Sequence, residues 1–188
     1  MRLSHLILGG ARSGKSRFAV AQLAPRTHVV FIATAQAGDR DMAQRIRRHR
    51  AERPSHWETI EEPYDLVGAL AKLDGRADAV LVDCVTVWVA NRLLRGDSDE
   101  VILGQVAALA AFIGRRSCDV MLVSNEVGEG VHPETVDGRR FRDLLGLVNQ
   151  RLAAACEQVT LMVAGLPLTI KAPVVTGASR SDVAQQAP

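Results

Sequence analysis

The sequence has few cysteines, and none of them are spaced as a metal site or a disulfide framework would require. Cys84, Cys118 and Cys156 lie far apart, with no CxxC pair and an odd total. Neither a zinc site nor a disulfide-stabilised fold is therefore expected. We interpret the three cysteines as small buried hydrophobic residues.

Long hydrophobic runs and a large net charge are also absent. No apolar stretch reaches the roughly 18–20 residues that a membrane span requires, and the N-terminus carries no signal-peptide cleavage pattern. We therefore expect a cytoplasmic protein without a membrane span. The formal net charge of +2 is too small to imply a polyanionic partner for the whole protein.

The apolar residues that are present suffice for one core. A chain of 188 residues with 47% apolar composition leaves little room for a second core. Short β-branched runs without strict alternation, typical of strands buried on both faces, lie at 3–8, 28–33, 79–82, 120–124 and 159–163. Stretches of helical periodicity lie at 15–23, 42–53, 64–73, 86–94, 98–113 and 141–157. This alternation predicts an α/β fold with a mainly parallel sheet flanked by helices.

The predicted elements form a single domain at residues 1–172. Within it, Asp41 is expected to cap a helix that Pro54 ends. From residue 173 onward the chain is rich in Gly, Ala, Ser, Gln and Pro and has almost no large apolar residues. Because such a segment cannot offset its ordering entropy by burial, we expect residues 173–188 to form a flexible tail.

A phosphate-binding motif follows the first predicted strand. Gly9, Gly14, Lys15 and Ser16 match GxxxxGK[ST], directly after a strand and at the start of a helix. The glycines let backbone N–H groups surround phosphate oxygens, and the helix N-terminus adds its dipole. Lys15 reaches the β and γ phosphates, and the Ser16 hydroxyl ligates Mg²⁺. The motif predicts a site for a purine triphosphate with Mg²⁺.

Asp83 is the candidate second ligand for this Mg²⁺. It ends the run 79–83, which places its carboxylate at the carboxyl end of a core strand. The alternative is a helix cap for the segment that begins at Thr86.

Basic residues crowd one predicted helix. The cluster consists of Arg45, Arg47, Arg48, His49, Arg50 and Arg53. It predicts either an anion-binding surface or a solvated helix face. Nonspecific nucleic-acid binding is disfavoured, because the cluster is short and has no interleaved aromatic residues.

His49 differs from the rest of this cluster. Met42, Ile46 and His49 follow i, i+4, i+7 and so share the helix stripe expected to face the protein. One interpretation is a buried histidine with a structural role. The other is a nucleophile that attacks a nucleotide phosphate beside guanidinium groups. Spacing alone leaves both open.

Together these residues resemble the bifunctional adenosylcobinamide kinase / adenosylcobinamide-phosphate guanylyltransferase family, which acts late in cobalamin assembly. The resemblance extends from Leu3 to about Lys171. It is carried by GGARSGKS at 9–16, IATA at 32–35, RRHRAERP at 47–54, VDC at 82–84, NEVG at 125–128, FRD at 141–143, NQR at 149–151 and VAG at 163–165.

The resemblance implies a RecA-like P-loop NTPase fold, a homotrimer, and two transfers. The first moves a γ-phosphoryl from ATP or GTP to adenosylcobinamide, and the second moves GMP from GTP to adenosylcobinamide phosphate through guanylylated His49. The Arg48, Arg50 and Arg53 guanidinium groups would offset the charge that accumulates. The nucleotide-binding positions are then Gly9, Gly10, Ala11, Arg12, Ser13, Gly14, Lys15, Ser16, Thr34, Ala35, Gln36, Arg50, Ala51, Glu52, Arg53, Glu61 and Asp83.

Other interpretations remain at this stage. A monofunctional small-molecule or nucleotide kinase would use the same motif and leave His49 unmodified. A GTP-dependent switch protein is disfavoured because Asn125 is followed by Glu126-Val127-Gly128, which departs from the guanine-reading NKxD pattern. The segment 125–128 itself is interpreted either as part of the corrinoid site or as an ordinary turn entering a helix.

Overall fold

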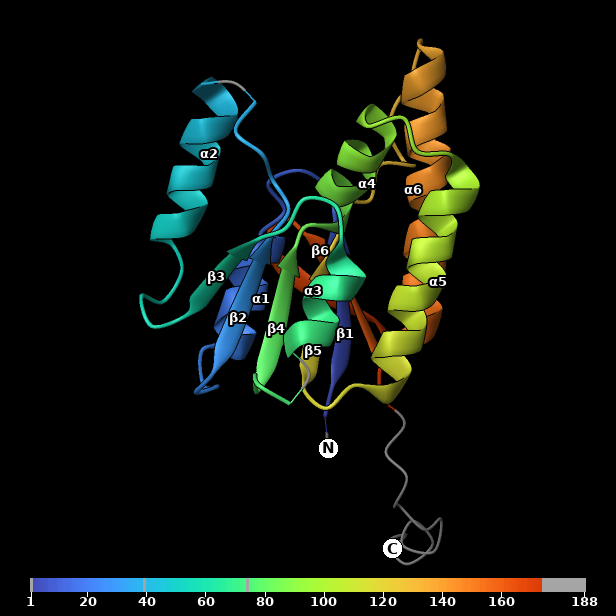
Figure 1. Cartoon of the computed structure of the whole chain (residues 1–188). Coiled ribbons are helices and arrows are strands. Elements are labelled where there is room, and N and C mark those ends of the chain that lie inside the picture. Colours follow the sequence, from blue (N-terminus) through green and yellow to red (C-terminus); the bar gives the residue numbers. More distant parts are fainter. Residues whose placement is uncertain (1, 39, 74, 174–188) are drawn as a thin grey trace, which may run out of the picture.

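The computed structural model of the protein describes residues 2–38, 40–73 and 75–173 (Figure 1). Its strands are β1 (Ser4–Gly9), β2 (Val29–Ala33), β3 (Glu58–Glu61), β4 (Ala79–Asp83), β5 (Asp119–Val123), β6 (Gln158–Val163) and β7 (Leu166–Lys171). Its helices are α1 (Lys15–Leu23), α2 (Arg40–Ala51), α3 (Leu66–Leu73), α4 (Val85–Leu94), α5 (Asp99–Arg115) and α6 (Val136–Ala155). The predicted tail from residue 174 on lies outside the described residues, as do the side chains of Asp41, Met42, Arg45 and Arg48.

The strands form one seven-stranded sheet in the order β3-β2-β4-β5-β1-β6-β7. All neighbouring pairs are parallel except β6 and β7, which form an antiparallel hairpin at the edge. The five predicted strands are confirmed, whereas β3 and β7 were not predicted. Both are edge strands: β3 has only four residues, and every residue of β7 is exposed. Neither therefore has the buried apolar run that identified the others.

The central strands are buried on both faces, which explains their uninterrupted apolar runs. On one face Ile7, Phe31 and Leu81 pack against Leu23 of α1. On the other face a larger core joins Ile32 and its neighbours to the buried sides of α3, α4, α5 and α6. The sheet is thus a layer between α1 and a group of four helices (Figure 1).

Side-chain caps fix the starts of three helices. The Cys84 thiol accepts the Val87 N–H at the start of α4. Ser98, the first residue of the helix predicted at 98–113, caps α5. Thr135 caps α6 by accepting the Gly138 N–H. Helix α6 therefore begins at Val136 rather than at the predicted residue 141, because its polar first turn carries no apolar periodicity.

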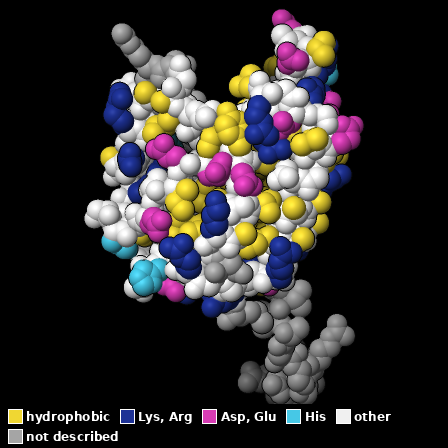
Figure 2. Space-filling model, viewed as in Figure 1, with side chains coloured by type: hydrophobic (Ala, Val, Ile, Leu, Met, Phe, Trp, Pro, Cys, Tyr) yellow, Lys and Arg dark blue, Asp and Glu magenta, His cyan; other side chains and the backbone are white. Residues whose placement is uncertain are grey.

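Helix α2 stands apart from both layers. Figure 1 shows it beyond the carboxyl ends of β2 and β3, rather than along a face of the sheet. The space-filling view is hollowed at this same end, between α2 on one side and the ends of α4 and α6 on the other (Figure 2). None of the described helices is long and apolar enough to cross a membrane.

Candidate nucleotide site at the carboxyl ends of the strands

The phosphate-binding motif forms the connection between β1 and α1. Gly9 has φ of 148° and Gly14, the residue before α1, has φ of 94°. A Cβ atom at Gly9 would lie 2.5 Å from the Met162 backbone oxygen, so the chain passes there without space for a side chain. The Gly165 N–H donates to the Ser13 carbonyl at 3.0 Å. The loop is thus held against the turn between β6 and β7.

Lys15 is buried within this loop. Its ammonium donates to the carbonyl oxygens of Gly9 at 2.8 Å and Gly10 at 2.6 Å, and contacts Ser13 Oγ at 3.4 Å. Burial lowers the pKa of Lys15, while the nearby charges of Cys84 and Asp83 oppose that shift. Burial raises the pKa of the Cys84 thiol to about 12, so Cys84 is a neutral thiol at neutral pH.

Asp83 ends β4 and does not cap a helix. The cap of α4 is the thiol of Cys84, so the alternative of a cap at Asp83 is wrong. The half-buried Asp83 carboxylate interacts electrostatically with Lys15 and Arg53. Among residues 2–38, 40–73 and 75–173, no group of three or more His, Cys, Asp or Glu side chains forms a metal site. One hydroxyl from Ser16 and one carboxylate from Asp83 fit Mg²⁺ carried by a nucleotide, which keeps waters and phosphates as its other ligands.

A cavity of about 260 Å³ joins the phosphate loop to α2. It is lined by Ser16, Arg17, Val20, Phe31, His49, Glu52 and Arg53. His49 is exposed, which excludes the buried structural histidine, but it lies on the side of α2 that lines this cavity with Ser16 and Phe31. Helix α2 projects beyond the strands rather than packing on the sheet, so its protein-facing side borders an open cavity (Figure 1). The imidazole lies on the same cavity as the hydroxyl of Ser16.

Arg53 is the cation most enclosed in this cavity. Its guanidinium carbon lies 3.4 Å from the centroid of the Phe31 ring, and its Nη1 donates to Thr59 Oγ1 at 3.4 Å. Its Nε is buried and has no hydrogen-bond partner among the described residues. Burial lowers the pKa of Arg53, with Asp83 and Glu61 opposing the shift and Arg50 adding to it. A buried guanidinium with an unused donor is suited to an anionic ligand.

Residues 34–36, which were predicted to line the nucleotide site, directly follow the carboxyl end of β2. The buried Thr34 hydroxyl donates to the Cys84 carbonyl at 2.8 Å and accepts the Cys84 N–H at 2.9 Å. Its polar groups therefore hold the end of β2 to the end of β4. The exposed Gln36 accepts a hydrogen bond from the Tyr64 hydroxyl at 3.1 Å, and the half-buried Ala35 lies between.

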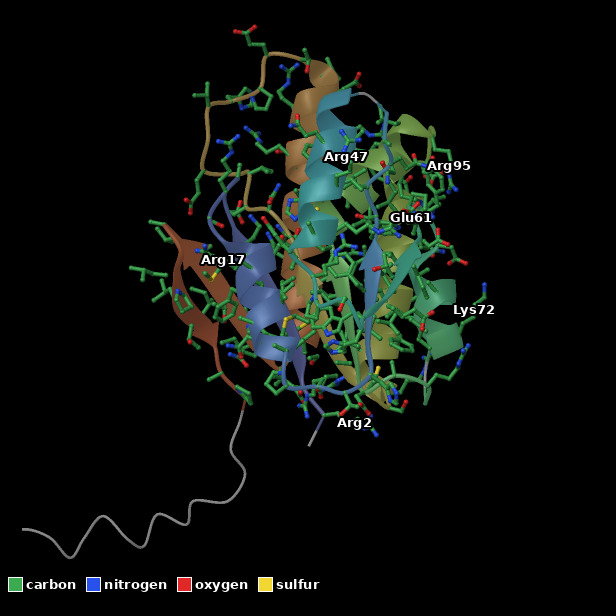
Figure 3. The ribbon with its side chains drawn as sticks, turned by 90° about the vertical axis from the view of Figure 1, so that its left-hand side faces the viewer. Arg2, Arg17, Arg47, Glu61, Lys72 and Arg95 are labelled. Atoms are coloured by element: carbon green, nitrogen blue, oxygen red, sulfur yellow. The ribbon has the colours of Figure 1, made fainter. Side chains whose placement is uncertain are left out.

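The other predicted positions cluster at the same end of the sheet. Of these, Glu61 lies at the end of β3 in Figure 3, remote from Arg2 at the opposite edge. Figure 3 also labels Arg17 on α1 and Arg47 on α2, which were not among the predicted site positions. In the loop, Gly10, Ala11 and Arg12 are exposed, and Arg12 has φ of 58°. Arg50 and Ala51, in the last turn of α2, are also exposed. Sequence reasoning missed Arg17, Val20 and Phe31 as cavity residues, although their place beside the motif and on the face of β2 toward α1 could have indicated them.

The segment 125–128 lies beside the phosphate loop. The Glu126 N–H donates to the Gly9 carbonyl at 3.1 Å, and the Glu126 carboxylate accepts the Gly128 N–H at 2.8 Å. Helix α6 begins eight residues after Gly128, so the alternative of a turn directly entering a helix is wrong. The segment is held against the start of the phosphate loop.

A family model described as cobinamide kinase / cobinamide phosphate guanyltransferase matches residues 5–170. The chain belongs to this family. The matched region contains the phosphate loop, α2, the residues that line the cavity joining Ser16 to His49, and all of the sheet except the first residue of β1 and the last of β7.

Individual relatives agree with this assignment. The bifunctional adenosylcobalamin biosynthesis protein CobP of Pseudomonas aeruginosa is 47% identical over 167 residues, which covers 88% of this chain and 96% of the relative. The bifunctional adenosylcobalamin biosynthesis protein CobU of Escherichia coli is 42% identical over 178 residues, covering 88% of this chain and 98% of the relative.

The fold is shared more widely than the sequence. An ATPase from the type III secretion system of pathogenic bacteria superposes with a TM-score of 0.58 at 10% identity, covering 89% of this chain and 56% of that ATPase. At that identity the likeness concerns the fold alone. The predicted P-loop NTPase fold, with a mainly parallel sheet flanked by helices, is confirmed.

Proposed function

We propose that the chain phosphorylates adenosylcobinamide with ATP or GTP and then transfers GMP from GTP to adenosylcobinamide phosphate through a covalent intermediate on His49. One observation carries this proposal: a single cavity is lined by Ser16 of the phosphate loop and by His49 of α2. Membership of the cobinamide kinase / cobinamide phosphate guanyltransferase family supports both transfers.

In the first transfer, a hydroxyl oxygen of adenosylcobinamide bonds to the γ-phosphorus, the bond to the β-phosphate oxygen breaks, and the hydroxyl proton leaves. The loop N–H groups and Lys15 orient the phosphates, which is most of the catalysis that phosphoryl transfer needs. Lys15 then exchanges its contacts with the carbonyls of Gly9 and Gly10 for phosphate oxygens. Mg²⁺ bound through Ser16 and Asp83 would neutralise negative charge on these phosphates.

In the second transfer, the unprotonated nitrogen of the His49 imidazole bonds to the α-phosphorus of GTP, and pyrophosphate leaves. A phosphate oxygen of adenosylcobinamide phosphate then bonds to that phosphorus and frees His49, which gives adenosyl-GDP-cobinamide. Arg53 faces the same cavity and is suited to hold the negative charge, with exposed Arg50 nearby on α2. Arg48 has the same proposed role, but its side chain lies outside the described residues.

The remaining predicted positions are proposed to line the nucleotide site. These are Gly10, Ala11, Arg12, Ser13, Gly14, Thr34, Ala35, Gln36, Ala51, Glu52 and Glu61. All lie in the phosphate loop, in α2 and the residue after it, or at the carboxyl ends of β2 and β3. We further propose that residues 1–172 act as one catalytic domain on small-molecule substrates, in the cytoplasm, where GTP and ATP are available.

We also propose that the chain assembles with copies of itself, as the trimer implied by the resemblance requires. Support comes from the β6–β7 hairpin, where Val163, Leu166, Leu168 and Ile170 are each more than half exposed. An apolar edge strand of this kind is usually covered by another chain. Light scattering tests this proposal, and a monomer at assay concentrations would contradict it.

Product analysis tests the two activities. The protein is incubated with adenosylcobinamide, GTP and Mg²⁺, and the corrinoids are separated by chromatography. The wild-type protein should yield adenosylcobinamide phosphate and then adenosyl-GDP-cobinamide. The His49→Ala variant should stop at the phosphate, because only the second transfer uses the imidazole. Loss of both products in a folded variant would refute the assignment of His49 to one step, and full activity would indicate a kinase without the histidine intermediate.

A further inference from the structure

Behind the phosphate loop, four buried or half-buried groups form a closed ring of hydrogen bonds. Its members are Thr86 of α4, Ser124 and Asn125 after β5, and Asn149 of α6. Asn149 Nδ2 donates to the Asn125 carbonyl at 3.0 Å, and Ser124 Oγ donates to Asn149 Oδ1 at 2.7 Å. The Asn125 N–H donates to Thr86 Oγ1 at 2.6 Å, and the two hydroxyls of Thr86 and Ser124 lie 3.3 Å apart.

The chemistry of these groups allows one direction around the ring. The Asn125 carbonyl can only accept, so the amide nitrogen of Asn149 must face it and the amide oxygen must face Ser124. The Ser124 hydroxyl has then used its proton, so the proton between the two hydroxyls comes from Thr86. The Thr86 hydroxyl also lies within hydrogen-bond reach of the Cys84 thiol, and the Thr86, Ser124 and Asn149 side chains are at least nine-tenths buried. Removing one side chain's polar group therefore leaves its partner in the ring without that hydrogen bond.

This ring is linked to the phosphate loop by one peptide. The residue after Asn125 is Glu126, whose N–H donates to the Gly9 carbonyl at 3.1 Å. The same carbonyl accepts the Lys15 ammonium at 2.8 Å. On its other side Gly9 lies against the Met162 backbone without room for a Cβ atom. The start of the phosphate loop is thus held between β6 and the segment that the ring fixes.

We propose that Asn149 is a positioning residue for phosphoryl transfer, because its side chain closes the ring that fixes the 125–126 peptide, and through it the Gly9 carbonyl beside Lys15. Asn149 does not touch the nucleotide. It acts indirectly, through the backbone of the phosphate loop, whose Gly9 carbonyl accepts the Lys15 ammonium. This inference deepens the proposed function and depends on it for the identity of the reaction.

The test changes one donor at a time. In Asn149→Asp the side chain keeps its shape and its acceptor toward Ser124, but it loses the donor for the Asn125 carbonyl. Gln150→Glu is the matched control, since the same chemical change falls on the exposed neighbouring residue of α6. A second pair separates packing from hydrogen bonding: Thr86→Val removes the hydroxyl at nearly constant volume, whereas Thr86→Ser keeps it.

For variants that circular dichroism shows to be folded, Mg-GTP affinity is measured by calorimetry and kcat by γ-phosphoryl transfer to adenosylcobinamide. Asn149→Asp and Thr86→Val should each raise Kd and lower kcat by about tenfold, the scale of one lost buried hydrogen bond. Gln150→Glu and Thr86→Ser should stay within about twofold of wild type.

Kinetic constants of Asn149→Asp within about twofold of wild type would overturn the inference. If Asn149→Asp does not fold, the Thr86 pair decides, and equal constants for Thr86→Val and Thr86→Ser overturn it. Failure of the proposed function looks different: wild-type protein would bind Mg-GTP but transfer nothing to the corrinoid, and the Kd comparison would still test the role of the ring.

Discussion

Replacing Gly9 by alanine should damage the phosphate loop far more than the same replacement at Gly10. At Gly9 the backbone has φ of 148°, and a new Cβ atom would lie 2.5 Å from the Met162 carbonyl oxygen and 2.7 Å from Ser13 Oγ. Both contacts are too short, and one involves backbone that cannot rotate away. At Gly10 the same atom would have no neighbour within 4 Å.

The size of the effect follows from two costs. Holding a side chain in this backbone region costs about 1–3 kcal/mol, and forcing an extra carbon into a filled space costs about 1–3 kcal/mol more. Gly9→Ala should therefore lower the free energy of unfolding by about 2–6 kcal/mol and Tm by at least about 4 °C for a domain of this size. Gly10→Ala should change the free energy of unfolding by no more than about 1 kcal/mol.

Urea unfolding and thermal scans of both variants provide the assay. Calorimetry with Mg-GTP adds a functional readout, because relief of the clash moves the Gly9 carbonyl that accepts both Lys15 and the Glu126 N–H. We expect the affinity of Gly9→Ala for Mg-GTP to fall by about tenfold or more. Equal stability of the two variants would refute the reasoning, since only one of the positions is enclosed.

Two further predictions concern buried cations and pH. Arg53→Leu should raise the Kd for Mg-GTP by about 10- to 100-fold, because a charge-assisted hydrogen bond to phosphate contributes about 1.5–3 kcal/mol, whereas Lys72→Leu on α3 should leave the calorimetric Kd unchanged. Similar losses in both would indicate a general charge effect. Burial lowers the pKa of His5 from 6.5 to about 4. Between these two pH values His5 therefore binds a proton in the unfolded chain and stays neutral in the folded chain. The free energy of unfolding, measured in urea, should fall by up to about 3 kcal/mol as pH drops from 6.5 to 4, and His5→Gln should remove that component; an unchanged pH slope in the variant would contradict it.

The sequence predicted the parts of the fold that burial encodes locally. Central strands such as 79–83 lie between two layers, so both faces are apolar and the run is continuous. The edge strands β3 and β7 lack this pattern, because one is short with glutamates at both ends and the other is exposed throughout. Their pairing depends on the neighbouring strand rather than on their own residues.

The residues of the candidate site could likewise be predicted only where a local sequence pattern encodes them. The phosphate loop is a continuous motif, so its glycines and Lys15 were found from spacing alone. The helical stripe indicated that His49 faces the rest of the protein, where it lines the cavity, but not that the side chain is exposed, because α2 projects beyond the strands. The contact of Glu126 with the loop arises because β5 lies beside β1, and no local pattern indicates that order.

The central claim is that His49 forms a covalent bond to GMP, and labelling tests it most directly. The protein is incubated with Mg²⁺ and GTP labelled at the α-phosphate, denatured, and separated from free nucleotide. The account predicts acid-labile label on the wild-type protein and none on His49→Ala, while GTP labelled at the γ-phosphate leaves both proteins unlabelled. Absence of α-label from the wild-type protein, or its persistence in His49→Ala, would contradict the account.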